Sequence, residues 1–125
     1  MYVKELLQLL TEREVRRTTI LYGIAGLLHG VLDPVVTYIL INTQRGRETN
    51  PLLRSVFEQG IGHVFIRHIP LFATLLACFT LLVYLFHIAD ETELKQLYWL
   101  SRFILGVCII WGLLLVSWNL YVLLR

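Results

Sequence analysis

The chain has 125 residues, of which 57% are hydrophobic and only 16% are charged. A water-soluble domain of this size has too little interior to bury so much apolar side chain, so the composition excludes an ordinary soluble globular fold. The net charge of +2 is also too small to indicate a nucleic-acid partner.

Three long stretches carry very few charges: residues 18–43, 61–88 and 97–124. Each exceeds the roughly 20 helical residues that cross a hydrocarbon core about 30 Å thick. We therefore predict an all-α integral membrane protein, a single membrane domain over residues 1–125 with three transmembrane helices in the lipid bilayer. The first stretch follows a charged segment and contains Asp33, so we do not expect a cleavable signal peptide.

Residues 1–17 precede the first span and alternate apolar and charged positions at about the helical period. Val3, Leu6 and Leu10 fall toward one side, and Lys4 and Glu12 toward another. This pattern predicts an N-terminal amphipathic helix that lies in the membrane interface before the chain turns inward. The alternative is that these residues simply extend the first span into water.

The first span carries an unusual row of small and polar residues on one helix face: Gly23, Gly26, Gly30, Asp33 and Thr37. Small residues allow another helix to approach closely, and a carboxyl group at this depth should face protein or water because its burial in lipid is costly. Pro34 removes an amide donor, which predicts a distortion of the helix beside Asp33. His29 lies four residues before Asp33, so the two side chains could share a proton or a ligand.

Residues 44–60 connect the first two spans. Asn50 before Pro51 is typical of a helix start, and Gly60 of a helix end, so we predict a short interfacial helix in this loop. Helix capping explains Asn50 and Pro51, but it does not explain Glu48.

The second span, residues 61–88, begins with polar residues on one face, among them His63 and Arg67, and His68 lies on a neighbouring face. Arg67 stands near the same membrane side as Asp33, and pairing the two charges is the least costly way to bury both. We therefore expect an Asp33–Arg67 ion pair. The alternative is that Arg67 extends to the interface and Asp33 is protonated.

Residues 89–96 form a short polar loop, with a helix start near Asp90, before the third span at 97–124. Cys78 and Cys108 both lie within spans, where thiols commonly pack as small apolar groups. Lysine and arginine are slightly more numerous on the side of the N-terminus, which favours a multi-pass protein of the cell membrane with a cytoplasmic N-terminus.

The sequence also resembles a known family. Asp33 and Thr37 are followed by Gly46-Arg-Glu48-Thr-Asn50-Pro51 and by Arg67 or His68 in the next span. This order resembles small archaeal and bacterial membrane proteins of unknown function with the signature D-x-x-T, G-x-x-E-x-N-P and a later lysine. The resemblance covers residues 29–70, although Asp33 and Thr37 are four apart instead of three, and Arg67 or His68 stands where the family has a lysine. It implies that Asp33, Thr37, Glu48, Asn50 and Arg67, with His68 nearby, form one polar cluster.

Three functions fit these observations. The first is a non-enzymatic homo-oligomer or subunit of a membrane complex, whose polar cluster organises the fold or binds a small ligand, ion or lipid. The second is a haem- or metal-binding subunit that uses His29, His63 and His68, because imidazole ligates haem and transition metals well. The third is an intramembrane hydrolase or transferase with Asp33 and Glu48 as acid and base. We predict no cofactor for the first, which is the reading that the sequence favours.

Overall fold

The computed structural model describes residues 2–43, 45 and 51–125, and within them it contains helices and short connections but no strand. The elements, in order, are α1 (Tyr2–Leu27), η1 (Leu28–Leu32), α2 (Asp33–Asn42), α3 (Pro51–Glu58), α4 (Ile61–Ile88) and α5 (Glu91–Leu124). The first three are continuous, so Tyr2–Asn42, α4 and α5 are three helical segments long and apolar enough to cross a membrane.

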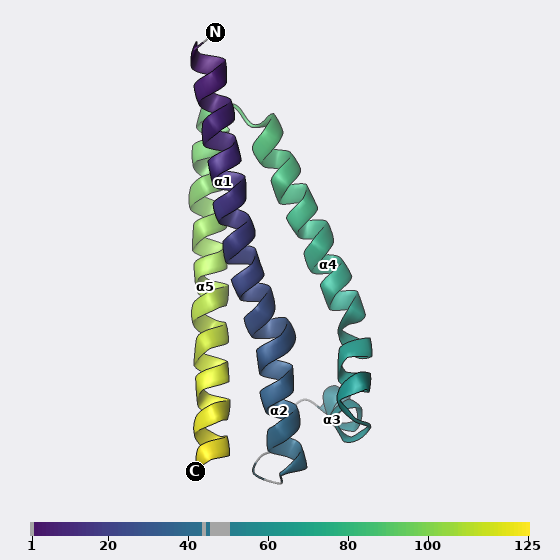
Figure 1. Ribbon diagram of the computed structural model, residues 1–125. Coiled ribbons are helices and arrows are strands. Elements are labelled where there is room, and N and C mark those ends of the chain that lie inside the picture. The colour runs from purple at the N-terminus through teal and green to yellow at the C-terminus, as the bar shows by residue number, and fades with distance from the viewer. Residues whose placement is uncertain (1, 44, 46–50) are drawn as a thin grey trace.

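The three segments alternate in direction (Figure 1). α1 and α2 run side by side with α5 and in the same direction, while α4 runs in the opposite direction. The N-terminus and the α4–α5 connection therefore lie at one end, and α3 and the C-terminus at the other. We call these the N-terminal end and the C-terminal end.

α1 differs from the expectation for residues 1–17. Tyr2–Leu27 is one unbroken helix, with no turn between residues 17 and 18. The physical reason is local, because no glycine or proline occurs between Tyr2 and Tyr22 to interrupt the hydrogen-bond ladder. The apolar residues near the N-terminus, such as Val3 and Leu6, consequently stay exposed on a straight extension of the first span.

The distortion expected from Pro34 takes the form of a π-helical turn, η1. Proline has no amide hydrogen to donate to the Gly30 carbonyl, and the Asp33 amide instead donates to the Leu28 carbonyl, five residues back. The wider turn also places Gly30 directly against the Phe72 ring of α4, where a Cβ atom would lie 2.5 Å from Phe72 Cε1. A side chain larger than hydrogen does not fit at position 30 without movement of that ring.

Two short segments connect the spans. In α3, Val56 and Phe57 pack with Val64 of α4 into a small core at the C-terminal end. Gly60 then reverses the chain with φ = 112°, a conformation that side chains rarely adopt. At the other end, Asp90 and Glu93 form a reciprocal capping box, so α5 begins at Glu91, within the loop expected over residues 89–96.

α4 is the least packed of the three segments. Only 6% of its most apolar window is buried, against 28% for the first segment and 17% for α5. Its contacts with α1 include a hydrogen bond from the Tyr22 hydroxyl to the Leu75 carbonyl of 2.8 Å and the Tyr22–Phe79 ring pair. The fold is thus a close α1/α2–α5 pair with α4 beside it.

Candidate functional site

A polar cluster links α2 to α5 near the C-terminal end. The Asn119 side-chain amide donates to Asp33 Oδ1 over 2.9 Å and to Thr37 Oγ1 over 3.3 Å. Asp33 and Thr37 are one helical turn apart and therefore present both acceptors to α5. Asn119 is well suited to this place because its NH₂ group carries two hydrogens, one for each acceptor. We call these three residues the Asp33 cluster.

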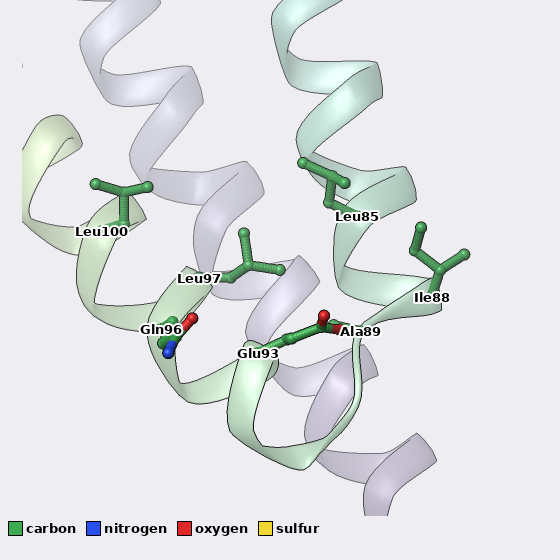
Figure 2. Close-up of a pocket in the computed structure, with 7 residues that line it drawn as sticks. All are labelled: Leu85, Ile88, Ala89, Glu93, Gln96, Leu97 and Leu100. Atoms are coloured by element: carbon green, nitrogen blue, oxygen red, sulfur yellow. The ribbon is translucent and has the colours of Figure 1, made fainter.

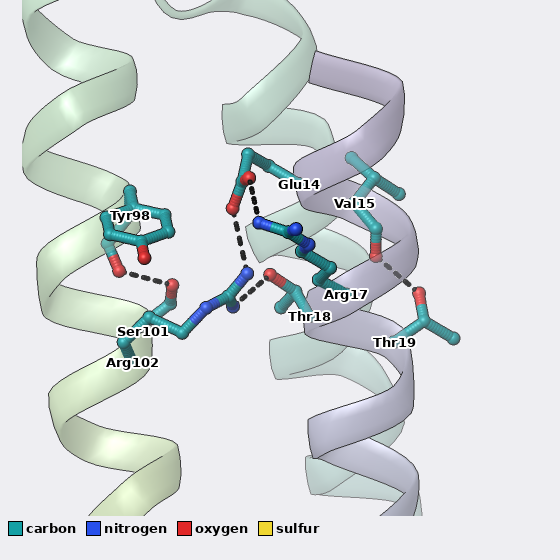
Figure 3. Close-up of polar contacts among 8 residues, drawn as sticks. All are labelled: Glu14, Val15, Arg17, Thr18, Thr19, Tyr98, Ser101 and Arg102. Atoms are coloured by element: carbon teal, nitrogen blue, oxygen red, sulfur yellow. Dashed lines mark hydrogen bonds and ion pairs between the residues drawn. The ribbon is translucent and has the colours of Figure 1, made fainter. Parts of the chain in front are cut away.

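A second polar cluster links α1 to α5 near the N-terminal end (Figure 3). Arg102 Nη2 lies 2.8 Å from Glu14 Oε2, and Arg102 Nη1 donates over 2.9 Å to the hydroxyl of Thr18, a fully buried residue. Glu14 also pairs with Arg17 over 3.4 Å. The Arg102 guanidinium stacks 5.0 Å above the centre of the Tyr98 ring. We call Glu14, Arg17, Thr18 and Arg102 the Glu14 cluster.

The two clusters join the same pair of segments at two depths. Seventeen residues of continuous helix separate Arg102 from Asn119, which corresponds to about 26 Å along α5. This length is close to the hydrocarbon thickness of a bilayer, about 30 Å. The aromatic pairs Tyr98–Trp99 and Trp118–Tyr121 lie at the same two levels of α5, a placement typical of interfacial anchors.

Between the clusters, η1 and α5 approach closely at His29. Its Nε2–H donates to the Cys108 carbonyl over 2.7 Å. The ring fits there because position 112 is glycine, where a Cβ atom would lie 2.9 Å from His29 Nε2. The sequence analysis considered His29 as a partner of Asp33 or a metal ligand, and the structure shows it bonded to the neighbouring helix backbone.

Among the described residues, Arg67, His68 and His63 form no recorded hydrogen bond or ion pair with Asp33. Arg67 is exposed, and among the described residues the structure records no ion pair between Arg67 and Asp33. The expected Asp33–Arg67 pair is therefore not formed there. His68 donates from Nδ1 to the Val64 carbonyl of its own helix over 2.6 Å, and His63 is exposed. Glu48 and Asn50 lie outside the described residues.

The physical reason lies in the rotation of α4. The face that α4 turns toward the bundle carries Val64, His68 and Phe72, spaced by four residues, and it excludes Arg67. Burying the valine and the phenylalanine removes apolar surface from water or lipid without the cost of enclosing a guanidinium. Arg67 is displaced to the outer side of the helix.

The histidines do not gather into a ligand set. No group of three or more histidine, cysteine, aspartate or glutamate residues that could hold a metal ion occurs in residues 2–43, 45 and 51–125. His29 and His68 each use one ring nitrogen for a backbone carbonyl.

A cleft of about 400 Å³ opens where α4 and α5 meet at the N-terminal end (Figure 2). Its walls are mainly apolar, with two polar residues, and comprise Leu85, Ile88, Ala89, Glu93, Gln96, Leu97 and Leu100. Glu93 belongs to the capping box of α5, which accounts for its carboxylate. No residue predicted from the sequence as a site residue lines this cleft.

The pairs Glu14–Arg102 and Asn119–Asp33 were not predicted from the sequence. A usable signal was present for the first, since Thr11, Glu14 and Thr18 follow the three- and four-residue spacing of a buried helix face. Asn119 is a single polar residue in an apolar span, and its partner depends on how α5 is rotated against α2.

Comparisons with known proteins give a family but no relative of known activity. The family described as Domain of unknown function (DUF5658) matches residues 24–125, which include all three residues of the Asp33 cluster. No curated protein and no solved structure matches the chain. Because the matched region covers most of the chain, the protein belongs to this family of unknown function.

Proposed function

We propose that this protein is a non-enzymatic, three-span membrane protein that acts as a homo-oligomer or as a subunit of a membrane complex. The N-terminus lies on the cytoplasmic side of the cell membrane. The α1/α2–α5 pair is the rigid part of the molecule, and α4 presents the surface that other helices cover. The observation that carries this proposal is the contrast in packing between α5, which is tied to the first segment at both ends, and α4, of whose most apolar window only 6% is buried.

The polar clusters support a structural role for their residues. In the Glu14 cluster, the Glu14 carboxylate contacts both Arg17 and Arg102, and Arg102 also donates to the Thr18 hydroxyl. In the Asp33 cluster, both hydrogens of the Asn119 amide are directed at α2. Polar groups in an apolar environment fix the rotation of one helix against another, because any other rotation leaves them without partners. The clusters therefore set the relation of α1 and α2 to α5.

The exposure of α4 supports assembly with other helices. Three helices enclose little interior, and in lipid the association of helices depends on close packing and hydrogen bonding rather than on the hydrophobic effect. α4 contributes a row of small side chains to its exposed side, including Ala73, Ala77 and Thr80. Lipid can cover this side in the monomer, and a second copy or a different subunit covers it in the assembled state.

Disulfide cross-linking between copies tests this proposal. Leu76 on α4 and Ile110 on α5 are exposed to similar extents, 65% and 62%. Each is replaced by cysteine in a chain whose Cys78 and Cys108 have been changed to serine, and native membranes are treated with a mild oxidant. We expect Leu76→Cys to give cross-linked dimers or a cross-link to another subunit, and the matched Ile110→Cys chain to give none.

Mass measurement in lipid nanodiscs provides the second arm. A protein extracted directly from its membrane should show a mass above that of one copy, and Asp33→Asn should lower that mass or the thermal stability. A single copy without a partner, together with no cross-link at position 76, would contradict the assembly proposal.

A further inference from the structure

The outer surface of α1 changes abruptly from basic to apolar along one exposed stripe. Arg13, Arg16 and Arg17 are followed at helical spacing by Ile20 and Ile24, and all five side chains are exposed. The three arginines occupy fewer than two turns of helix, so they form a compact basic patch directly above the apolar surface. We call these three residues the arginine patch.

The acidic groups at this level do not neutralise the patch. Glu14 is shared by Arg17 and Arg102, so one carboxylate serves two guanidinium groups. Glu12 accepts a hydrogen bond from Gln8, toward the N-terminus. Four arginines therefore stand against two carboxylates, a surplus of two positive charges. Arg13 and Arg16 make no recorded hydrogen bond or ion pair with the described residues.

The depth of the patch matches the phosphate layer of a bilayer. The Glu14 cluster lies at one end of the interval of about 26 Å that separates the two polar clusters along α5. The exposed Trp99 lies beside Tyr98 at the same level. Tryptophan and tyrosine prefer the headgroup region, and phosphates lie just outside the hydrocarbon boundary. The apolar residues from Ile20 onward would then contact acyl chains, with the arginine patch at the phosphates.

We propose that Arg13, Arg16 and Arg17 bind the phosphate groups of anionic phospholipids on the N-terminal side of the membrane. This inference rests on the proposed membrane-spanning function and adds a lipid class and a site to it. Guanidinium groups form paired hydrogen bonds with phosphate, and a surplus of positive charge favours lipids with a net negative headgroup over zwitterionic ones. The occupant is a lipid rather than a free anion because the apolar stripe continues directly below the charges.

The test uses a fluorescent reporter placed one turn below the patch. Ile20→Trp is made in the full chain with Trp99, Trp111 and Trp118 changed to phenylalanine, and the protein is reconstituted in vesicles of brominated phosphatidylglycerol or brominated phosphatidylcholine. Bromine on the acyl chain quenches tryptophan at short range, so mixtures of brominated and ordinary lipids give the relative affinity for each headgroup. We expect a several-fold preference for phosphatidylglycerol.

The decisive variant is Arg13→Gln/Arg16→Gln, which leaves the Glu14 cluster intact. The preference should fall to about one, because each basic residue at an anionic membrane surface contributes about fivefold to the affinity for anionic lipid. Arg67→Gln/Arg125→Gln makes the same change of charge at the C-terminal end, where both residues are exposed, and should leave the preference unchanged. Native mass spectrometry of the chain with its tryptophans intact, counting retained phosphatidylglycerol, checks the result independently.

The outcomes separate the inference from the proposed function. If neither brominated lipid quenches the reporter, residue 20 does not contact acyl chains and the membrane-spanning proposal fails. If both lipids quench equally, with no effect of Arg13→Gln/Arg16→Gln, only the lipid site is overturned. Inorganic phosphate, compared with chloride at the same ionic strength, should not remove the preference. Its removal would identify a free-anion site and overturn the proposal.

Discussion

The close approach of η1 to α5 makes Gly112→Ala the most informative substitution. A Cβ atom at position 112 would lie 2.9 Å from His29 Nε2 and 3.0 Å from Leu28 Cβ. The histidine ring could swing away only by losing its hydrogen bond to the Cys108 carbonyl, and Leu28 Cβ moves only with its backbone. The two helices must therefore separate locally.

The magnitude follows from three contributions. Overpacking costs about 1–3 kcal/mol, and loss of the His29–Cys108 hydrogen bond costs about 1 kcal/mol. Replacing glycine by alanine within a helix raises its stability by about 1 kcal/mol. We therefore expect Gly112→Ala to lower the free energy of unfolding by about 1–3 kcal/mol. Gly106→Ala on the same helix has nothing within 4 Å of its Cβ and should be neutral or raise it by up to about 1 kcal/mol.

The assay is equilibrium unfolding in mixed micelles, in which sodium dodecyl sulfate is titrated into dodecyl maltoside and helix content is followed by circular dichroism. The His29→Ala background provides an internal check, because removing the ring should reduce the cost of Gly112→Ala. Equal stability of the Gly112→Ala and Gly106→Ala proteins would refute the close approach of η1 to α5 at this position.

Three further predictions use the same unfolding assay. Glu14→Gln should destabilise the protein by about 2–3 kcal/mol. This is less than the roughly 3–5 kcal/mol typical of a fully buried pair, because the partners keep some access to water. The Glu14→Gln/Arg102→Gln double variant should lose less stability than the sum of the two single changes. Asn119→Leu should cost about 1–3 kcal/mol because it removes the donor shared by two acceptors, and an unchanged stability would contradict the role of the Asp33 cluster. Tyr22→Phe should lower the stability by about 1 kcal/mol through loss of the hydrogen bond to the Leu75 carbonyl of α4. Tyr84→Phe, at an exposed position, should have no measurable effect, and equal effects of the two would argue against the Tyr22–Leu75 bond.

Local features of the sequence predict much of the fold. The apolar stretch at residues 61–88 has the same bounds as α4, because helix length in an apolar segment depends on where polar and helix-breaking residues fall. The helix start near Asp90 is confirmed as a capping box, whose two hydrogen bonds involve residues only three apart. Pro34 likewise distorts the helix in its own neighbourhood, although the sequence does not specify that the distortion is a π-helical turn.

The partners of the polar side chains were decided by the tertiary structure. Asp33 and Thr37 could be predicted to share a face, but the residue opposite them is Asn119 of α5 rather than Arg67 of α4. Arg67 and His68 differ by one position, about 100° around a helix, so a modest rotation exchanges which of them faces the bundle. The sequence by itself therefore determined three apolar helices and their distortions. Helix packing alone, through the apolar contacts of α4 and the glycine contact of α5, decided which polar groups meet.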